Sequence, residues 1–249
     1  MKAARIQELK AYIKAHRQAT NEELCEAMDI SMSTLRRDLA GLQEEGFIKK
    51  VYGGVAYSEP SPVPPYEYRD EQNAPEKNTV GRIAAGLIRD NDVIFIDSGT
   101  TTPYILNYIT AQNVTVLTNN ATIVSRALDY PNLSIFVLPG IYYPETMSFC
   151  CPDAIEFLER YEISKAFLAA SGFSSRGATN SAAWEYTLKK YITERVKESY
   201  LCIASAKFGI SRIITYCGVD QLAGIITERE PDEAMKQLLN EKGVRLITP

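Results

Sequence analysis

Histidine is almost absent from this chain, because His16 is the only one among 249 residues. A zinc site built on histidines and a Ser-His-Asp catalytic triad both need imidazole groups. A single histidine, which we expect near the end of the first helix, cannot supply them. We therefore predict no catalytic residues of these classes and no metal site, and we expect no cofactor.

Long apolar runs are missing as well. No stretch approaches the roughly 20 apolar residues that span a bilayer, and residues 1–5 are not followed by the apolar core of a signal peptide. The five cysteines are an odd number without a Cys-x-x-Cys pair, which is typical of reduced thiols buried as small apolar side chains. We expect a cytoplasmic protein that does not contact a membrane.

A net positive charge, the usual mark of a nucleic-acid-binding protein, is also lacking, since the chain carries −4 at pH 7. Residues 1–57 hold nine Lys and Arg against eight Asp and Glu, and the remainder holds 18 against 23. Any contact with DNA must therefore come from the local placement of a few cations rather than from bulk charge.

The most informative pattern in the sequence lies between residues 20 and 54. Thr20 and Glu23 have the spacing of a capping box, which predicts a helix starting near Asn21. Residues 29–31 interrupt this helix. Apolar residues at helical spacing within residues 2–15 predict another helix in front of it, so that a small bundle can form.

The helix after the interruption carries outward polar residues. Ser31 or Ser33 can cap it, and three leucines recur at helical spacing along its inner face. Thr34, Arg36 and Arg37 are then left facing outward. Two short helices joined by a tight turn, the second presenting hydroxyl and guanidinium groups, have the geometry that reads a DNA major groove.

A basic hairpin follows this helix. Gly46 ends the helix, residues 47–48 begin an extended segment, and residues 49–55 have the pattern of a tight β-wing with paired lysines at its base. Such a wing would lie against phosphates. We predict a winged helix-turn-helix domain over residues 1–57 that binds double-stranded operator DNA. The predicted DNA-binding residues are Ser33, Thr34, Arg36, Arg37, Lys49, Lys50 and Tyr52.

The simplest alternative is a small helical subdomain whose charges are only solvated. The cap, the turn, the arginine pair and the wing together favour DNA binding. Residues 34–39, Thr-Leu-Arg-Arg-Asp-Leu, followed by a basic wing that ends in Gly53 and Gly54, also resemble the N-terminal domain of the DeoR family of bacterial repressors. Leu35 takes the place of an isoleucine in the family pattern.

Beyond the wing the composition changes. Five prolines within residues 58–75 disfavour regular structure, so we predict a linker there. Over residues 76–249, helix-like segments alternate with continuous apolar runs that suit strands buried on both faces. We therefore predict an α/β domain with a mainly parallel sheet covered by helices. The predicted helices span residues 76–89, 121–128, 153–161, 184–197 and 232–241, and the predicted strands span residues 93–97, 114–118, 134–138, 166–170, 200–205, 224–227 and 244–247.

Polar turns follow three of these strands, at the sheet edge where ligands of such folds bind. Residues 97–102, Asp-Ser-Gly-Thr-Thr-Thr, combine a glycine, hydroxyl donors and a helix start that favours an anion. Residues 118–120 and the loop 171–180 add further polar groups, and Lys207 can bring a cation to the same edge. Each turn alone is equally typical of an ordinary helix cap. Together they predict a phosphorylated sugar as effector, bound by Asp97, Ser98, Gly99, Thr100, Thr101, Thr102, Thr118, Asn119, Gly177, Thr179 and Lys207.

The order of these motifs is similar to that in the DeoR-type sensor domain. The runs FIDSGTTTPYIL, LTNN, LPG, GATN and AKFG follow one another as they do in that family, so the resemblance covers nearly the whole chain. It implies a sensor fold similar to ribose-5-phosphate isomerase and a phosphorylated sugar as inducer. GTTTP and GATN are most similar to the deoxyribonucleoside repressor, which makes deoxyribose 5-phosphate a candidate. Ala204 and Ser171 replace acidic residues of many members, so an altered sugar preference is equally compatible.

We therefore expect a homo-oligomeric regulator whose effector shifts it toward a form that holds the operator poorly. Repression rather than activation is implied by the resemblance alone. One alternative is a sugar-phosphate isomerase-like enzyme with an N-terminal DNA-binding appendage. Residues 169–175, however, lack the carboxylate that such proton transfer needs, and only Asp97 and Glu185 remain near the edge. A winged domain used only for protein contacts is the other alternative.

Overall fold

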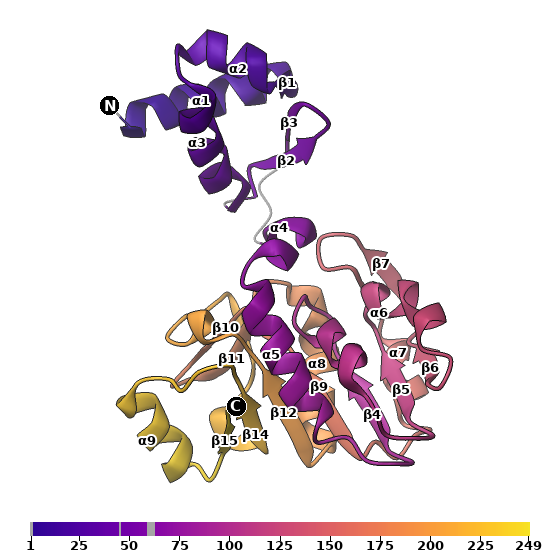
Figure 1. The fold of residues 1–249 in the computed structure, drawn as a ribbon. Helices are drawn as coiled ribbons and strands as arrows, with labels where there is room; N and C mark the ends of the chain where they lie inside the picture. The colour runs from indigo at the N-terminus through magenta and orange to yellow at the C-terminus, as the bar shows by residue number, and fades with distance from the viewer. Residues whose placement is uncertain (1, 45, 59–62) are drawn as a thin grey trace. The chain divides into compact units, whose positions relative to one another are not determined.

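The computed structural model describes residues 2–44, 46–58 and 63–249, and the chain divides into two compact units between residues 69 and 70 (Figure 1). The first unit has a hydrophobic core of its own, and the second has a core on each face of its sheet. Within the described ranges, no helix is long and apolar enough to cross a membrane.

The first unit is the predicted winged helix-turn-helix domain. Three helices bury Leu9, Leu24 and Leu35 between them, and a small antiparallel sheet in the order β1-β3-β2 closes the core. Strand β1 was not predicted from the sequence. The elements are α1 (Lys2–His16), β1 (Gln18–Thr20), α2 (Asn21–Met28), α3 (Met32–Glu44), β2 (Ile48–Val51) and β3 (Gly54–Tyr57).

The capping residues of α2 and α3 explain where these helices begin. The Thr20 hydroxyl accepts the Glu23 N–H at 3.2 Å, and the Glu23 carboxylate accepts the Thr20 N–H at 2.7 Å, which confirms the capping box. Asp29, with φ of 48°, ends α2 in the left-handed conformation. Ser31 then caps α3, because its hydroxyl accepts the Thr34 N–H at 3.4 Å.

The structure requires glycine at positions 53 and 54 of the wing for two different reasons. Gly53 has φ of +75°, a conformation that side chains rarely adopt, and it forms the turn between β2 and β3. Gly54 lies so close to β1 that a Cβ atom there would sit 2.2 Å from the Ala19 carbonyl oxygen. The pairing of β1 with β3 in the wing sheet therefore depends on a glycine at position 54.

The proline-rich segment contains more regular structure than we predicted. Residues 59–62, and with them Pro60 and Pro62, lie outside the described residues, but α4 (Tyr66–Glu71) and the start of α5 (Ala74–Ala85) fall within residues 58–75. Pro75 occupies the first turn of α5, where the missing N–H would have no helical partner. Because proline fits the first turn of a helix, the proline content of residues 58–75 does not exclude a helix that begins there.

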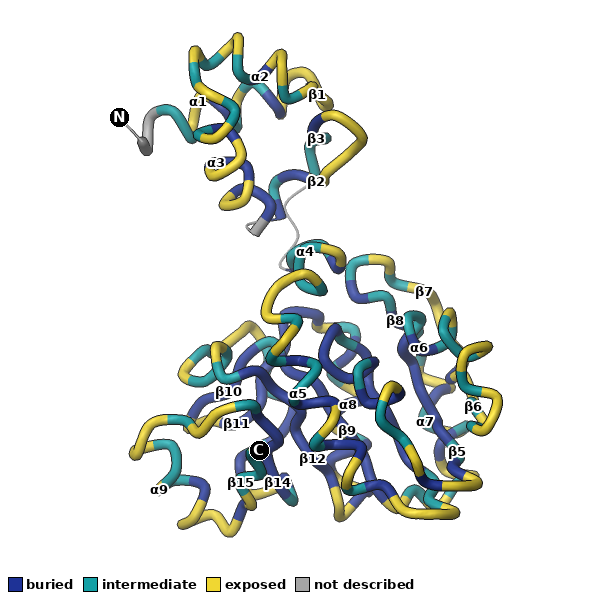
Figure 2. The backbone as a smooth tube through the Cα atoms, viewed as in Figure 1, coloured by how far each residue is buried: buried dark blue, intermediate teal, exposed yellow. Residues whose placement is uncertain are grey.

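The second unit is built on a parallel seven-stranded sheet in the order β15-β14-β12-β9-β4-β5-β6, which confirms the predicted fold class. The sheet strands are β4 (Val93–Ile96), β5 (Thr115–Thr118), β6 (Ser134–Val137), β9 (Lys165–Leu168), β12 (Glu198–Cys202), β14 (Gly224–Ile226) and β15 (Arg245–Ile247). Strands β4, β9 and β12 are buried almost throughout (Figure 2).

Helices cover both faces of this sheet and create two cores. On one face α5 packs with the 3-10 helix η1 (Thr102–Tyr108) and α6 (Ala121–Ser125), and on the other lie α7 (Asp153–Leu158), α8 (Tyr186–Arg195) and α9 (Glu233–Glu241). Further 3-10 turns are η2 (Ala127–Asp129), η3 (Ala183–Glu185), η4 (Ser205–Lys207) and η5 (Val219–Gln221).

Two antiparallel pieces accompany the main sheet and were not predicted. One is the hairpin of β7 (Ile141–Tyr143) and β8 (Ser148–Cys150). The other is a small sheet of β10 (Gly172–Ser174), β11 (Gly177–Asn180) and β13 (Ile214–Cys217). Residues 171–180, which we predicted as a loop, are therefore mostly a β-hairpin, and the loop prediction was wrong. Its strands are too short and too polar to show the apolar alternation of a typical strand.

Candidate DNA-binding surface and effector site

Helix α3 turns Arg36 and Arg37 outward and Asp38 inward. Arg36 and Arg37 are exposed, and neither makes an ion pair with the described part of the chain, whereas Leu35 is buried in the core. Asp38 is only 3% exposed and accepts a hydrogen bond from Arg5 Nε at 2.7 Å. The outer surface of α3 is therefore more positive than its sequence composition indicates.

The hydroxyl groups predicted to contact DNA lie at the start of the same helix. The Ser31 oxygen lies 3.0 Å from the Ser33 Oγ and 3.1 Å from the Thr34 Oγ1. This cluster also caps the helix. Ser33 is exposed and Thr34 partly exposed, so both can be reached from the arginine side of the first turn.

The wing presents the remaining predicted residues. Lys49 and Lys50 are exposed on β2, and Tyr52 is fully exposed at the tip of the hairpin (Figure 2). The Tyr52 ring has an apolar body and a polar hydroxyl, so it can contact a sugar or a phosphate beside the lysines.

In the second unit, Asp97 lies at the point where the strand order reverses. The chain continues from β4 to β5 and β6 in one direction, whereas β9 starts the series β9, β12, β14 and β15 in the other. The Asp97 N–H donates to the Phe167 carbonyl at 3.0 Å, and its carboxylate accepts the Ala169 N–H at 3.0 Å. Open parallel sheets bind ligands at this reversal point.

Three buried ionisable groups meet there. Lys189 of α8 donates directly to the Asp97 carboxylate, lies 3.6 Å from Glu185 and donates to the Ala169 carbonyl at 3.1 Å. All three charged side chains are almost completely buried. This cluster connects the end of β4 to the start of α8.

Glu185 is fully engaged by donors from separate parts of the unit. Its Oε1 accepts from the Ser98 hydroxyl at 2.7 Å and from the Ser148 hydroxyl at 3.0 Å, and its Oε2 accepts from the Asn180 amide at 2.6 Å. One carboxylate therefore connects the turn after β4, hairpin β7–β8, strand β11 and α8.

Burial and pairing act on these groups in opposite directions. Burial raises the pKa of Asp97, and the attraction of Lys189 only partly opposes it. Burial also acts to raise the pKa of Glu185, but Lys189 and the hydrogen bonds outweigh it, so this pKa lies below its ordinary value. For Lys189 the two carboxylates outweigh burial and raise the pKa, so the ammonium stays protonated.

Several predicted effector residues hold the turns in place. The Thr102 hydroxyl donates to the Asp97 carbonyl at 2.7 Å, and the Thr118 hydroxyl donates to the Ile96 carbonyl at 2.6 Å. Ser98, Thr100 and Thr101, like these two threonines, are buried. Gly99 has φ of +120°, and a Cβ atom there would lie 2.8 Å from the Cβ of Ala169, so the turn requires glycine.

The helix starts that we expected to favour an anion are weaker than predicted. The turn after β4 leads into η1, a 3-10 helix of seven residues, and the turn after β5 leads into α6, which has five residues. Such short helices have only a small macrodipole, because few peptide dipoles add together. The helix-dipole argument for a phosphate at these turns does not hold.

Three further predicted effector residues, Gly177, Thr179 and Lys207, come from strand β11 and the 3-10 turn η4. Gly177 and Thr179 belong to β11, where the Thr179 hydroxyl donates to the Gly172 carbonyl at 3.1 Å. Asn180, the next residue, reaches Glu185 instead. Lys207 donates to the Ala170 carbonyl at 2.8 Å, which places its ammonium at the carboxyl end of β9.

Lys189, Asn180 and Ser148 were not predicted as site residues from the sequence. Lys189 stands four residues after Glu185, the spacing of an ion pair on one helix face, and that spacing was the available signal. The position of Asn180 beside Glu185 follows from the alternation of side chains along strand β11. Residues 171–180 were predicted as a loop, where no such alternation is expected.

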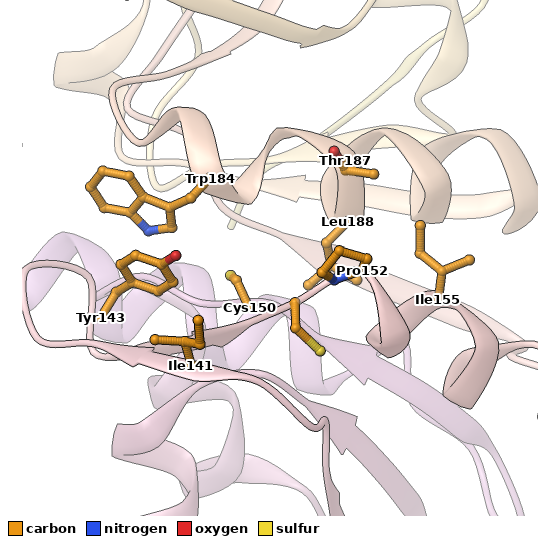
Figure 3. A pocket seen from close by; sticks show the side chains of 9 residues that line it. Ile141, Tyr143, Cys150, Pro152, Ile155, Trp184, Thr187 and Leu188 are labelled. Atoms are coloured by element: carbon orange, nitrogen blue, oxygen red, sulfur yellow. The ribbon is translucent and has the colours of Figure 1, made fainter.

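A pocket of ≈ 210 Å³ is lined by residues of hairpin β7–β8 and of helices α7 and α8, and has mostly apolar walls (Figure 3). Tyr143 and Trp184 stack in its wall with ring centroids 4.9 Å apart. None of the predicted effector residues lines it. The lining residues are Ile141, Tyr143, Cys150, Cys151, Pro152, Ile155, Trp184, Thr187 and Leu188.

Comparisons with known proteins show the family of the chain. The chain matches the DeoR-like helix-turn-helix domain over residues 5–61 and the DeoR C terminal sensor domain over residues 72–229. The HTH-type transcriptional regulator IolR of Bacillus subtilis (strain 168) is 41% identical over 243 residues, 97% of each chain. The HTH-type transcriptional repressor GlcR of the same organism is 28% identical over 237 residues, 95% of this chain and 92% of GlcR.

Among solved structures, ribose 5-phosphate isomerase A from Methanocaldococcus jannaschii is similar with a TM-score of 0.42, 15% identity and 55% of each chain covered. The family models account for most of the chain, and the resemblance seen in the sequence motifs is confirmed. The chain belongs to the DeoR family of helix-turn-helix transcriptional regulators.

Proposed function

We propose that this regulator represses a sugar or nucleoside catabolic operon and that a phosphorylated sugar releases it from its operator. Deoxyribose 5-phosphate is the first candidate for the effector. The observation that carries the DNA-binding part is the outward arginine pair of α3, Arg36 and Arg37, followed by Asp38, which is buried. Guanidinium groups in this position contact guanine edges or phosphates in a major groove.

The strand-end region supports the effector part. Asp97, Ser98 and Asn119 lie at the carboxyl ends of adjacent strands β4 and β5, next to the reversal of the strand order. We propose that Lys207 meets the phosphate, because its ammonium lies at the neighbouring end of β9. The other proposed contacts are Gly99, Thr100, Thr101, Thr102, Thr118, Gly177 and Thr179.

We propose that the protein acts as a homo-oligomer in the cytoplasm. Helix-turn-helix proteins bind two half-sites one helical turn of DNA apart, and the two-fold symmetry of the operator matches that of a dimer. The winged unit presents one α3, so recognition of two half-sites needs a second copy.

Turnover of a sugar phosphate is not expected, because Glu185 cannot act as a general base in this arrangement. Both of its oxygens accept hydrogen bonds, and Lys189 adds a nearby positive charge. A general base needs a free lone pair within reach of the substrate proton. The relatives IolR and GlcR are likewise regulators by name.

Gel-shift titration tests the DNA-binding part. The operator can be obtained by selecting tight binders from random duplex DNA with the parent protein. Arg36→Ala and Arg37→Ala are expected to weaken operator binding by about 1 to 3 kcal/mol while the fold is kept, because each removes a base or phosphate contact. Lys49→Ala should weaken selected and random DNA alike and lower the salt dependence.

Lys14→Ala is the matched control. Lys14 is exposed on α1, so this variant loses the same charge from a different element, outside α3 and strands β2 and β3. If both arginine variants bind the operator as well as the Lys14 variant does, the proposed surface is wrong.

A further inference from the structure

The Asn119 side chain is buried without a hydrogen-bond partner. It is 0% exposed, and neither its amide nitrogen nor its amide oxygen is paired with any described residue. The neighbouring Asn120 is equally buried but fully used, since it donates to the Asp97 and Gly99 carbonyls and accepts the Thr122 N–H. Buried polar groups are nearly always paired, so an orphaned amide at a strand end indicates a missing partner.

Strand register places this amide beside the ionic cluster. Ile96 pairs with Thr118 in the parallel ladder, so Asp97 and Asn119 come next in register and their side chains point to the same face of the sheet. Phe95 and Leu117, two residues earlier in each strand, share one core on that face. Lys189 and Asp97 pair there as well.

The charge of this cluster limits what can bind beside it. Two carboxylates, of Asp97 and Glu185, stand against one ammonium, of Lys189, so the ionised cluster carries a net charge of about −1. A phosphate next to it would be repelled in a medium of low dielectric constant. A hydroxyl group carries no charge and, like the amide, has both a donor and an acceptor.

We infer that the Asn119 amide binds a hydroxyl group at the uncharged end of the effector, with the phosphate pointing away from this corner. Lys207 is suitably placed for the other end. Its ammonium lies at the end of β9, two strands from β5, which corresponds to about 10 Å at the usual strand spacing. A pentose or hexose phosphate can bridge such a span. Only the phosphate end of this inference rests on the proposed function.

Thermal unfolding of two adjacent variants tests the amide without any ligand. Asn119→Leu removes a polar group that has no partner, so its Tm is expected to equal or exceed that of the parent. Asn120→Leu, the matched control, removes three hydrogen bonds and should lower the Tm by several degrees. If Asn119→Leu lowers the Tm as much as Asn120→Leu does, the amide has a structural role and the inference is overturned.

Binding measurements test the orientation. Calorimetry would compare the parent with Asn119→Ala, which needs no extra space, against a panel of pentose and hexose phosphates, the same sugars without phosphate, and inorganic phosphate. Loss of the amide is expected to weaken a sugar phosphate and its parent sugar alike, by about tenfold, and to leave inorganic phosphate unchanged. Weaker inorganic phosphate binding would show that the phosphate lies at Asn119, against the inference.

The two proposals fail separately. A parent protein that binds an unphosphorylated polyol through Asn119 but no sugar phosphate would refute the proposed effector and keep the inference. A parent that binds neither would refute both.

Discussion

Replacing Lys189 removes the only cation of a buried cluster. Lys189→Met keeps the length of the side chain and its apolar contacts but leaves Asp97 and Glu185, both almost fully buried, without the ammonium between them. Breaking a buried ion pair by removing one partner typically costs about 3 to 5 kcal/mol. For a unit of this size we expect the Tm of the sensor to fall by about 6 to 20 °C.

The single tryptophan makes the measurement specific. Trp184 lies directly before Glu185, so its fluorescence during heating or in urea reports the sensor unit and not the winged unit. Lys190→Met is the matched control, because Lys190 follows in the same helix and is exposed. Its ammonium lies 3.8 Å from the exposed Glu194 carboxylate and 5.9 Å from the centroid of the Tyr186 ring. This control is expected to change stability by less than about 0.5 kcal/mol.

The pH dependence gives a second readout. The folded-state pKa of Lys189 is raised, so the stability that it contributes is present below its ordinary pKa of 10.5 and is lost as the pH rises through the folded value. The pKa of Glu185 is lowered, so its contribution is present above 4.5 and is lost as the pH falls. The gap between parent and Lys189→Met should therefore narrow in acid. A Lys189→Met protein as stable as Lys190→Met would refute the reasoning.

Two further outcomes are expected. Lys207→Met should weaken sugar-phosphate binding by about one to two powers of ten, because it removes a charge-assisted hydrogen bond, and should leave operator affinity without effector within about threefold. Operator release would be measured against effector concentration, and overlapping curves for the variant and the parent would contradict this prediction. Asp92→Asn should cost about 1 to 3 kcal/mol in urea unfolding, because Asp92 pairs with Lys165 at 2.8 Å in a largely buried place, whereas the exposed Glu156→Gln should cost almost nothing. Burial acts to raise the pKa of Asp92, but Lys165 and other hydrogen bonds outweigh burial and lower this pKa. The stability difference between the parent and Asp92→Asn should therefore fade below pH 3.8. An equal loss of stability in Asp92→Asn and Glu156→Gln would refute the prediction.

The main sheet could be predicted because each strand is buried on both faces. Continuous apolar runs such as residues 93–96 are rare outside such strands, and the capping box at Thr20 gave the start of α2 directly. Hairpin β7–β8 and the sheet around β11 could not be predicted, because their strands are very short, and because β11 pairs with β13, which is distant in the sequence.

The position of the effector site at the strand ends stays a prediction, whereas the buried ion pair of Asp97 and Lys189 was not predicted from the sequence. Asp97 follows a recognisable strand, and strand ends are where such folds bind ligands. Lys189 lies within an amphipathic helix, where a lysine usually faces solvent, and only the folded sheet shows that it faces Asp97. The spacing of Lys189 to Glu185 indicated an ion pair along the helix, but the contact with Asp97 is known only from the tertiary structure.

The strand order of the sensor also has a consequence for synthesis of the chain. Strand β4 pairs with the central strand β9, so the middle of the sheet cannot close until residues beyond 165 have left the ribosome. The core of the winged unit, in contrast, needs only residues from Leu9 to Val55, and its contacts are short in sequence. A nascent chain that stalls within the sensor already holds every residue of the DNA-reading unit, while the part that would respond to a metabolite still lacks the centre of its sheet.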